Sequence, residues 1–241
     1  MRLGIQKTSL VDYPGRVAAV LFTAGCAFRC PYCHNPDLVS PAGDDGIHGD
    51  DGIAGDDGLV SVEEALAFIE HRKPVLSGVV ISGGEPTIHD GLPALAAAIK
   101  RLGLLVKLDT NGSRPERIAA VGADYVAMDL KTRPGRYAEL WPGAPADAAD
   151  RIREAARAVR GSGAEYEFRI TCAPGFVTEE DAEAISEVLE PGDAVYLQRY
   201  RPGRVLDPAW AAGVSPYTEE RLERILAIVR RAAPKARLRG F

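Results

Sequence analysis

The sequence predicts an α/β protein built from a parallel sheet and covering helices. Apolar, strand-like runs alternate strictly with helical patterns six times along the chain. Such alternation produces a parallel sheet that is either open and doubly wound or curled into a barrel. A complete eight-unit barrel typically needs about 250 residues. Six units within 241 residues fit a partial (β/α)6 barrel of the TIM type, open on one side, although the count alone allows the doubly wound sheet as well.

The individual elements follow from apolar runs, caps and turn residues. Ser61 and Glu64 have the spacing of a capping box, and Gly103 suits the position just after a helix. An opening segment, 2–6, precedes the alternating units, and 236–239 adds a short strand after them. The predicted strands are 17–22, 79–81, 104–108, 125–130, 165–171 and 194–199, and the predicted helices are 61–72, 92–102, 115–121, 146–160, 178–189 and 219–232.

Composition indicates an ordinary globular protein of 25.8 kDa, with 46% hydrophobic and 26% charged residues. We expect a single domain over 1–241. No run approaches the roughly 20 apolar residues of a membrane span, and residues 1–7 lack the apolar core of a secretory signal. We therefore expect a cytoplasmic protein without a membrane partner. The net charge of −5 and the absence of a basic block argue against nucleic-acid binding.

One stretch, 41–59, departs from the alternation. It repeats a Gly-Asp-Asp-Gly unit three times with a period of six residues. Calcium-binding β-rolls use a longer, nine-residue period and many copies, so three copies supply too few ligands. The interpretation that we favour is a flexible, solvated loop inserted between a strand and a helix.

Three of the four cysteines lie close together. Cys26, Cys30 and Cys33 form a C-x3-C-x2-C pattern, while Cys172 is far downstream. Zinc sites usually pair cysteines as C-x2-C or add a histidine, and His34 is too close to Cys33 to bind the same ion easily. An iron–sulfur cube normally takes four thiolates, so three would leave one iron open to a substrate or cofactor. Alternatively Cys172 completes a four-cysteine electron carrier, although a buried, inert thiol suits it better.

Other polar or glycine-rich motifs follow the successive predicted strands. They are 82–86, 109–112, 129–131, 173–175 and 198–203, and the cysteines themselves follow the first strand. Singly, each has a structural explanation: a tight turn at Gly83 and Gly84, or an ion pair between Asp129 and Lys131. Together they lie at the carboxyl ends of parallel strands, where barrels and open sheets assemble active sites.

These residues resemble a known family. Cys26, Cys30 and Cys33, with Tyr32 before the last cysteine and Gly83-Gly84-Glu85-Pro86 downstream, resemble the radical S-adenosylmethionine enzymes. Segments 8–15 and 22–38 narrow the resemblance to activases of glycyl radical enzymes, and most closely to anaerobic ribonucleoside-triphosphate reductase activating proteins. The resemblance covers nearly the whole chain outside the repeat and implies a partial (β/α)6 barrel.

The resemblance implies a [4Fe–4S] cluster on the three cysteines, with S-adenosylmethionine on the open iron. Tyr32 would then lie against the adenine, the backbone of Gly83, Gly84 and Glu85 would meet the methionine amino group, and Lys131 would pair with the carboxylate. A monovalent cation beside that carboxylate would be held by Asp109, Thr110 and Asp129. Asn111 and Gln198 complete the expected cofactor-binding set, Gln198 standing where some activases have a histidine.

The implied reaction is cleavage of S-adenosylmethionine to generate a glycyl radical on a partner, expected to be anaerobic ribonucleotide reductase. No cysteines are present for further clusters, so an external donor such as flavodoxin or ferredoxin must supply the electron. Two alternatives stay open at this point. One is a radical enzyme that acts on a small molecule of the deazapurine type, and the other is the four-cysteine electron carrier.

Overall fold

The computed structural model describes residues 1–39 and 58–240, and all statements below concern these residues. The predicted repeat loop, 41–59, falls outside them except for its last two positions, Gly58 and Leu59.

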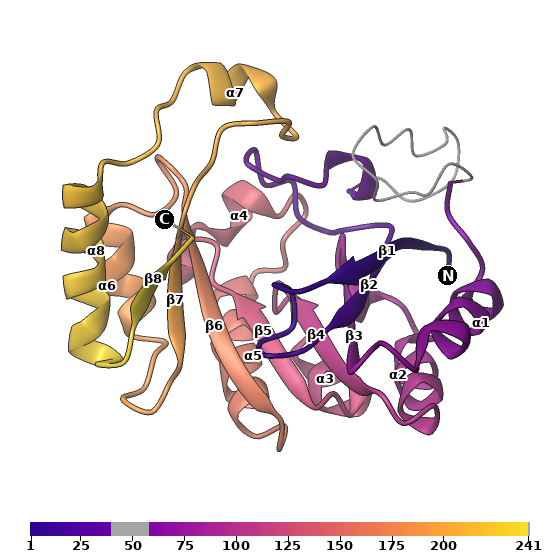
Figure 1. Ribbon diagram of the computed structural model, residues 1–241. Coiled ribbons are helices and arrows are strands. Elements are labelled where there is room, and N and C mark those ends of the chain that lie inside the picture. The colour runs from indigo at the N-terminus through magenta and orange to yellow at the C-terminus, as the bar shows by residue number, and fades with distance from the viewer. Residues whose placement is uncertain (40–57, 241) are drawn as a thin grey trace.

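A single eight-stranded sheet, ordered β1 to β8 as along the chain, forms the centre of the fold (Figure 1). Strand β1 runs antiparallel to β2, and all later neighbours are parallel. A doubly wound sheet would reverse its strand order at a switch point, so this topology excludes that alternative. The strands are β1 (Leu3–Ser9), β2 (Ala18–Thr23), β3 (Gly78–Gly83), β4 (Leu105–Thr110), β5 (Tyr125–Asp129), β6 (Glu165–Cys172), β7 (Val195–Arg199) and β8 (Arg237–Arg239).

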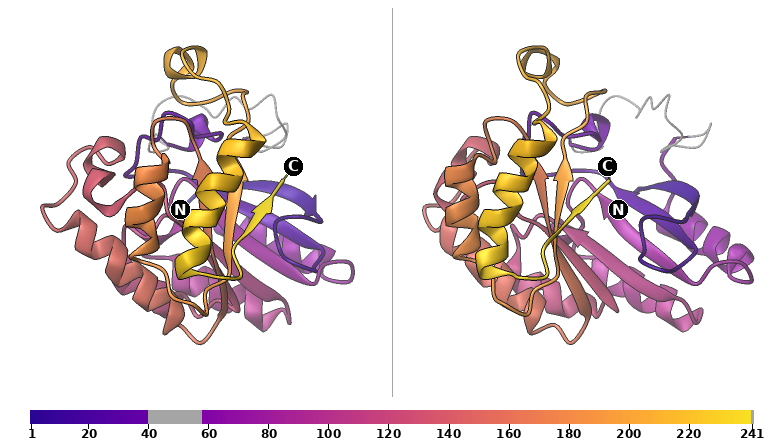
Figure 2. Two further views of the ribbon diagram at one scale, coloured as in Figure 1. Left: turned by 90° about the vertical axis from the view of Figure 1, so that its left-hand side faces the viewer. Right: turned by 60° about the vertical axis from the view of Figure 1, so that its left-hand side comes forward.

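The sheet curls without closing, because β1 and β8 are its two edges and do not pair with each other in the described chain (Figure 2). Strands β2 to β7 with their helices confirm the partial (β/α)6 barrel. The opening segment, for which the sequence predicted no place in the sheet, forms β1, an antiparallel edge strand.

The helices lie on the outer face of the curved sheet, except for the short α7, which lies beyond the ends of the strands (Figures 1 and 2). They are α1 (Val62–Arg72), α2 (Leu92–Arg101), α3 (Pro115–Ile118), α4 (Tyr137–Leu140), α5 (Ala148–Arg160), α6 (Glu179–Ser186), α7 (Pro208–Ala212) and α8 (Glu219–Ala232). Short 3-10 turns cover Pro36–Leu38 (η1), Pro86–Ile88 (η2), Ala119–Val121 (η3) and Pro134–Arg136 (η4). Within the described ranges, no helix is both long and apolar enough to span a bilayer.

Local sequence signals account for the helix boundaries. The Ser61 hydroxyl accepts from the backbone N–H of Glu64 at 3.1 Å, and the Glu64 carboxylate accepts from the N–H of Ser61 at 2.7 Å, which confirms the capping box. Gly103 has a φ of +82° just beyond α2, as predicted. The sequence did not reveal α4 and α7, because four and five residues are too few to show a helical period.

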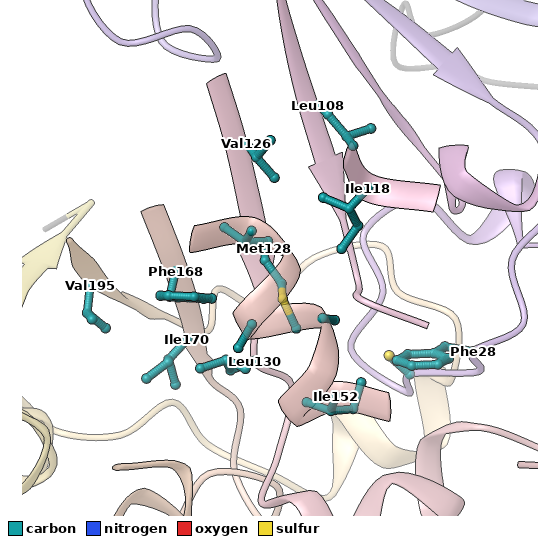
Figure 3. Close-up of a cluster of buried hydrophobic side chains, with 14 of the residues drawn as sticks. Phe28, Leu108, Ile118, Val126, Met128, Leu130, Ile152, Phe168, Ile170 and Val195 are labelled. Carbon is teal, nitrogen blue, oxygen red and sulfur yellow. The ribbon is translucent and has the colours of Figure 1, made fainter. Parts of the chain in front are cut away.

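Alternation along the strands separates an apolar outer face from a mixed inner face. On the outer face, Leu108, Val126, Met128 and Phe168 pack with helix residues such as Ile152 of α5 (Figure 3). The inner face carries a small apolar cluster and, beside it and toward the carboxyl ends of the strands, polar side chains that are buried or nearly so: Lys107, Asp109, Glu167 and Arg169. Polar groups inside a barrel require partners, so this end of the barrel is the place to look for a functional site.

Candidate functional site

A cavity of about 540 Å³ opens at the carboxyl ends of the parallel strands. It collects residues from the loops after β2, β3, β4 and β5 and from β6 and β7 themselves. Every candidate site residue predicted from the sequence lines this one cavity: Cys26, Cys30, Tyr32, Cys33, Gly83, Gly84, Glu85, Asp109, Thr110, Asn111, Asp129, Lys131 and Gln198.

The three cysteines lie in the loop that follows β2, with free thiols. The backbone of this loop is fixed by a hydrogen bond from Gly25 N–H to the Leu38 carbonyl at 2.7 Å. Burial raises the pKa of Cys26 to about 11 and that of Cys30 to about 12, and it also raises the pKa of Cys33. The thiols are therefore protonated in the metal-free protein, and binding a metal group would release protons.

The arrangement of the thiols suits a cluster better than a single ion. In the described ranges no three His, Cys, Asp or Glu side chains are placed to hold one metal ion. A four-iron cluster bonds each thiolate to a different iron atom, so its ligands need not converge on one point. Three thiols on the wall of one cavity fit a cluster with an open iron that faces that cavity.

Cys172 is separate from this group. It is fully buried at the end of β6 among apolar side chains, and the cavity lining does not include it. Burial raises its pKa to about 12. These facts confirm that the thiol is buried, and they disfavour the four-cysteine electron carrier.

The positions of Gly83 and Gly84 leave no room for a side chain, because backbone atoms of the same chain lie very close to them. A Cβ on Gly84 would lie 2.2 Å from the carbonyl oxygen of Gly25, and one on Gly83 would lie 2.4 Å from the backbone of Thr23. Gly84 N–H donates to Thr23 and Glu85 N–H donates to Gly25, both at 2.8 Å. The glycines thus lock the loop after β3 against the loop that bears the cysteines. A ligand's amino group donates hydrogen bonds, so at this loop it would bind to the carbonyl oxygens.

The Glu85 side chain joins the loop after β3 to the loop after β4. Its buried carboxylate accepts from Thr87 N–H at 3.1 Å and Thr87 hydroxyl at 2.6 Å, from Thr110 hydroxyl at 2.7 Å, and from Asn111 N–H at 2.6 Å. Burial raises the pKa of Glu85, and these hydrogen bonds oppose the rise. The resemblance assigned a role only to the backbone here, and the structure adds this role for the side chain.

A charge network crosses the inner face of the barrel. Arg169 of β6 lies 2.8 Å from a carboxylate oxygen of Asp129 and 3.4 Å from one of Asp109. Lys131 pairs with Asp129 at 2.9 Å, the ion pair that the sequence offered as a structural explanation of these two residues, and Lys107 pairs with Asp109. Burial alone would raise the pKa of Asp129, but Arg169 and Lys131 outweigh it and hold the pKa well below its usual range. The two carboxylates, of Asp109 and Asp129, are therefore paired with three cationic side chains of the same protein: Lys107, Lys131 and Arg169.

Sequence reasoning missed Arg169. A signal was present, since Glu167, Arg169 and Thr171 occupy alternate positions of β6 and so share one face. The carboxylate of Glu167 is buried and accepts two hydrogen bonds from Arg239 of β8, at 2.7 and 2.8 Å.

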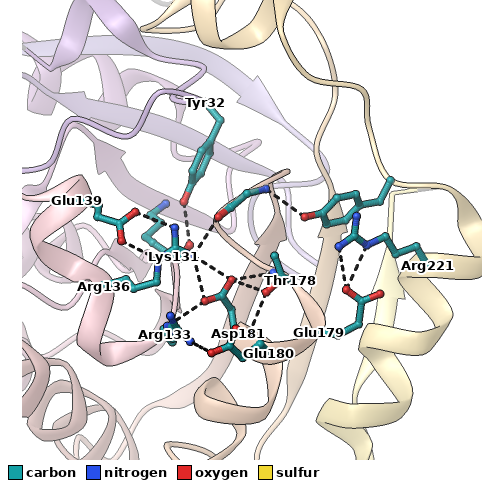
Figure 4. A network of polar contacts seen from close by, with 12 residues as sticks. Tyr32, Lys131, Arg133, Arg136, Glu139, Thr178, Glu179, Glu180, Asp181 and Arg221 are labelled. Atoms are coloured by element: carbon teal, nitrogen blue, oxygen red, sulfur yellow. Dashed lines mark hydrogen bonds and ion pairs between the residues drawn. The ribbon is translucent and has the colours of Figure 1, made fainter.

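Lys131 follows β5 on a segment that hydrogen bonds hold from two sides, and Figure 4 shows its contact with Tyr32. Tyr32 donates its hydroxyl to the Lys131 carbonyl at 3.0 Å, and Lys131 N–H donates to the Tyr137 hydroxyl at 3.1 Å. Beyond it, Arg133 and Arg136 converge on the buried carboxylate of Asp181 at the start of α6. The ring of Tyr32 packs against Phe176 and Trp210 with centroids 5.5 and 6.0 Å away.

The segment after β7 closes over the cysteine loop. Leu206 N–H donates to the carbonyl of Cys33 at 3.1 Å, and Asp207 N–H donates to that of Pro31 at 3.0 Å. Arg204 pairs with Asp37 at 2.7 Å. The segment after β7 therefore fixes the turn that carries the second and third cysteines.

A second cavity, of about 970 Å³, adjoins the first on the open side of the barrel. The two share Asp12, His34, Arg169, Thr171 and Gln198. The second cavity continues to β8 and to the turn between β1 and β2. A molecule that entered from the open side would thus reach the cavity lined by the thiols.

Comparisons with known proteins agree with this site. The model of the Radical SAM superfamily matches residues 20–189. A protein of Methanocaldococcus jannaschii, provisionally named a glycyl-radical enzyme activating enzyme, is 31% identical over 211 residues, which cover 85% of this chain and 81% of that protein. The pyruvate formate-lyase-activating enzyme of Streptococcus mutans is 35% identical over 132 residues, half of this chain and 46% of the enzyme. A radical SAM methyltransferase from Sphaerobacter thermophilus shares the fold, with a TM-score of 0.64 and 19% identity over 96% of this chain and 68% of that one.

The chain belongs to the Radical SAM superfamily, the class that the barrel and the three-cysteine loop define. Within that superfamily it belongs to the branch of glycyl-radical-enzyme activases.

Proposed function

We propose that this protein cleaves S-adenosylmethionine reductively and uses the resulting radical to remove a hydrogen atom from a glycine Cα of a partner enzyme. The observation that carries the proposal is the joined pair of cavities. The inner one is lined by Cys26, Cys30 and Cys33, and the outer one leads to it from the open side of the barrel. A protein loop that bears the glycine has a route to the site.

A [4Fe–4S] cluster on the three thiolates supplies, when bound, the electron that splits the sulfonium of S-adenosylmethionine into methionine and a 5′-deoxyadenosyl radical. The chain's own residues bind and orient the reactants. Lys131 offers an ammonium group to the methionine carboxylate, and the carbonyl groups of the Gly83–Gly84 loop are suited to its amino group. Tyr32 borders the cavity near the third cysteine and suits the adenine, and Gln198 offers an uncharged amide.

The sequence led us to expect a monovalent cation beside Asp109, Thr110 and Asp129. The Thr110 hydroxyl donates to Glu85, and Arg169 already bridges both carboxylates. We therefore propose that Arg169 supplies the positive charge that the cation was expected to supply.

The partner that we propose is anaerobic ribonucleotide reductase, and the electron donor is an external protein such as a flavodoxin or ferredoxin. The partner assignment rests on the resemblance of segments 8–15 and 22–38. We also propose a single domain over 1–241, because one continuous sheet unites the strands from both ends of the described chain.

The first experiment is electron paramagnetic resonance of the anaerobically reconstituted, reduced protein, with and without S-adenosylmethionine. The proposal expects a cluster signal that changes when S-adenosylmethionine is added, 5′-deoxyadenosine as a product, and an organic radical on co-incubated anaerobic ribonucleotide reductase. Cys30→Ala is the matched control and should show neither signal. A cluster signal indifferent to S-adenosylmethionine, with no nucleoside product, would exclude radical chemistry. Nucleoside product without a protein radical would favour the small-molecule alternative.

A further inference from the structure

Asn111, just after β4, points its side-chain amide at the first cysteine. Its Nδ2 atom lies 3.6 Å from the Sγ atom of Cys26, within hydrogen-bond distance for sulfur. The backbone N–H of Phe28 donates to the same sulfur at 3.3 Å. Cys26 thus receives one donor from its own loop and one from the loop after β4.

The direction of the Asn111 amide follows from its other contacts. Its Oδ1 atom accepts from Ser113 N–H at 2.9 Å, so the oxygen must face that donor and the NH2 group must face Cys26. Its backbone N–H donates to Glu85 at 2.6 Å. Glu85 N–H in turn donates to Gly25, the residue before Cys26. The donor and the sulfur therefore belong to one hydrogen-bonded unit.

We propose that Asn111 sets the reduction potential of the cluster through its hydrogen bond to Cys26. This rests on the proposed function, since it requires a cluster on the three thiolates. Asn111 is a positioning residue here because it acts on the cluster only through the sulfur of Cys26.

The direction of the effect follows from charge. Reduction by one electron places more negative charge on the cluster and its sulfur ligands. An N–H donor stabilises the reduced form more than the oxidised form, and hydrogen bonds to sulfur are among the factors that set cluster potentials. Loss of the donor should therefore make the midpoint potential more negative. We expect a change of about tenfold in the ratio of reduced to oxidised cluster, which corresponds to about 59 mV for one electron.

The test is a redox titration of the reconstituted full-length protein without S-adenosylmethionine, with cluster content and circular dichroism recorded for each variant. Asn111→Ala removes the donor. Asn111→Ser also removes the donor, but its hydroxyl can still accept from Ser113 N–H. The same shift in potential is expected for this variant, which replaces Asn111→Ala in the test if the alanine variant loses the cluster. Asn111→Asp keeps the acceptor and places a negative oxygen near the sulfur. Ser113→Ala is the matched control, because the buried Ser113 hydroxyl has no hydrogen-bond partner in the described chain.

Asn111→Asp should have the most negative midpoint potential, and Asn111→Ala and Asn111→Ser should lie between it and the wild type. Ser113→Ala should have the same potential as the wild type. Unchanged potentials in cluster-loaded Asn111 variants would overturn the inference, as would an equal shift in Ser113→Ala. Absence of any cluster from the wild-type protein would instead refute the proposed function.

Discussion

Replacement of Glu85 tests the idea that one buried carboxylate holds the site together. In Glu85→Gln the retained oxygen can still accept the three bonds from Thr87 and Thr110. The new NH2 group then faces the N–H of Asn111, which is left buried without an acceptor. An unsatisfied buried donor costs about 1–3 kcal/mol, so we expect a loss of about 2 kcal/mol in the free energy of unfolding.

Glu85→Ala should be more severe, because it leaves the N–H groups of both Thr87 and Asn111 without acceptors. The same argument gives a loss of about 4 kcal/mol. The assay is urea unfolding of the metal-free protein under reducing conditions, with a common slope fitted across variants. Glu116→Gln is the control, since its carboxylate is about half exposed and its only described ion pair, with Arg114, is 4.0 Å long. If both Glu85 variants stayed within about 0.5 kcal/mol of wild type, the carboxylate would not hold the two loops.

Three further predictions concern the same end of the barrel. Gly84→Ala should lower unfolding free energy by about 3 kcal/mol through overpacking against backbone, whereas Gly91→Ala, with no atom within 4 Å of the new Cβ, should be neutral in the same urea assay. Arg169→Met should cost about 3 kcal/mol at pH 7. Because the pKa of Asp129 is lowered in the folded wild type, its ionised carboxylate stabilises the fold above pH 3.8, the ordinary pKa of the group, and this stabilisation is lost as the pH falls below that value. The difference in unfolding free energy between wild type and Arg169→Met should therefore narrow in unfolding curves recorded below about pH 4. Cys172→Ser should keep its full iron content by chemical analysis, while its free energy of unfolding falls by about 1 kcal/mol because a hydroxyl is buried. Loss of iron from this variant would instead support the four-cysteine electron carrier.

The sequence was sufficient for the barrel and for the location of the site because both depend on periodic or local signals. Alternating apolar runs marked β2 to β7, and the carboxyl ends of those strands had to meet at one rim. The spacing of Cys26, Cys30 and Cys33 is equally local. Residues 82–85 and 109–111 line the same cavity for the topological reason alone.

What escaped prediction depends on contacts between distant segments. The pairing of β1 with β2 is antiparallel, which no pattern within Leu3–Ser9 reveals. The partners of Glu85 lie up to 26 residues away, and Arg169 bridges carboxylates on two other strands. The glycines at 83 and 84 were attributed to close approach of a ligand, whereas their nearest neighbours are backbone atoms of residues 22–25 and 38.

The contacts of Leu206 and Asp207 with the cysteine loop have a consequence for biosynthesis. About 170 residues separate these donors from the carbonyl groups of Cys33 and Pro31. A ribosome releases the cysteines well before the segment that fixes their turn emerges. Until then the loop that bears the thiols lacks the hydrogen bonds from Leu206 and Asp207. Iron–sulfur assembly on this chain is accordingly expected to follow synthesis of that segment, and a nascent chain truncated before residue 204 should retain cluster poorly.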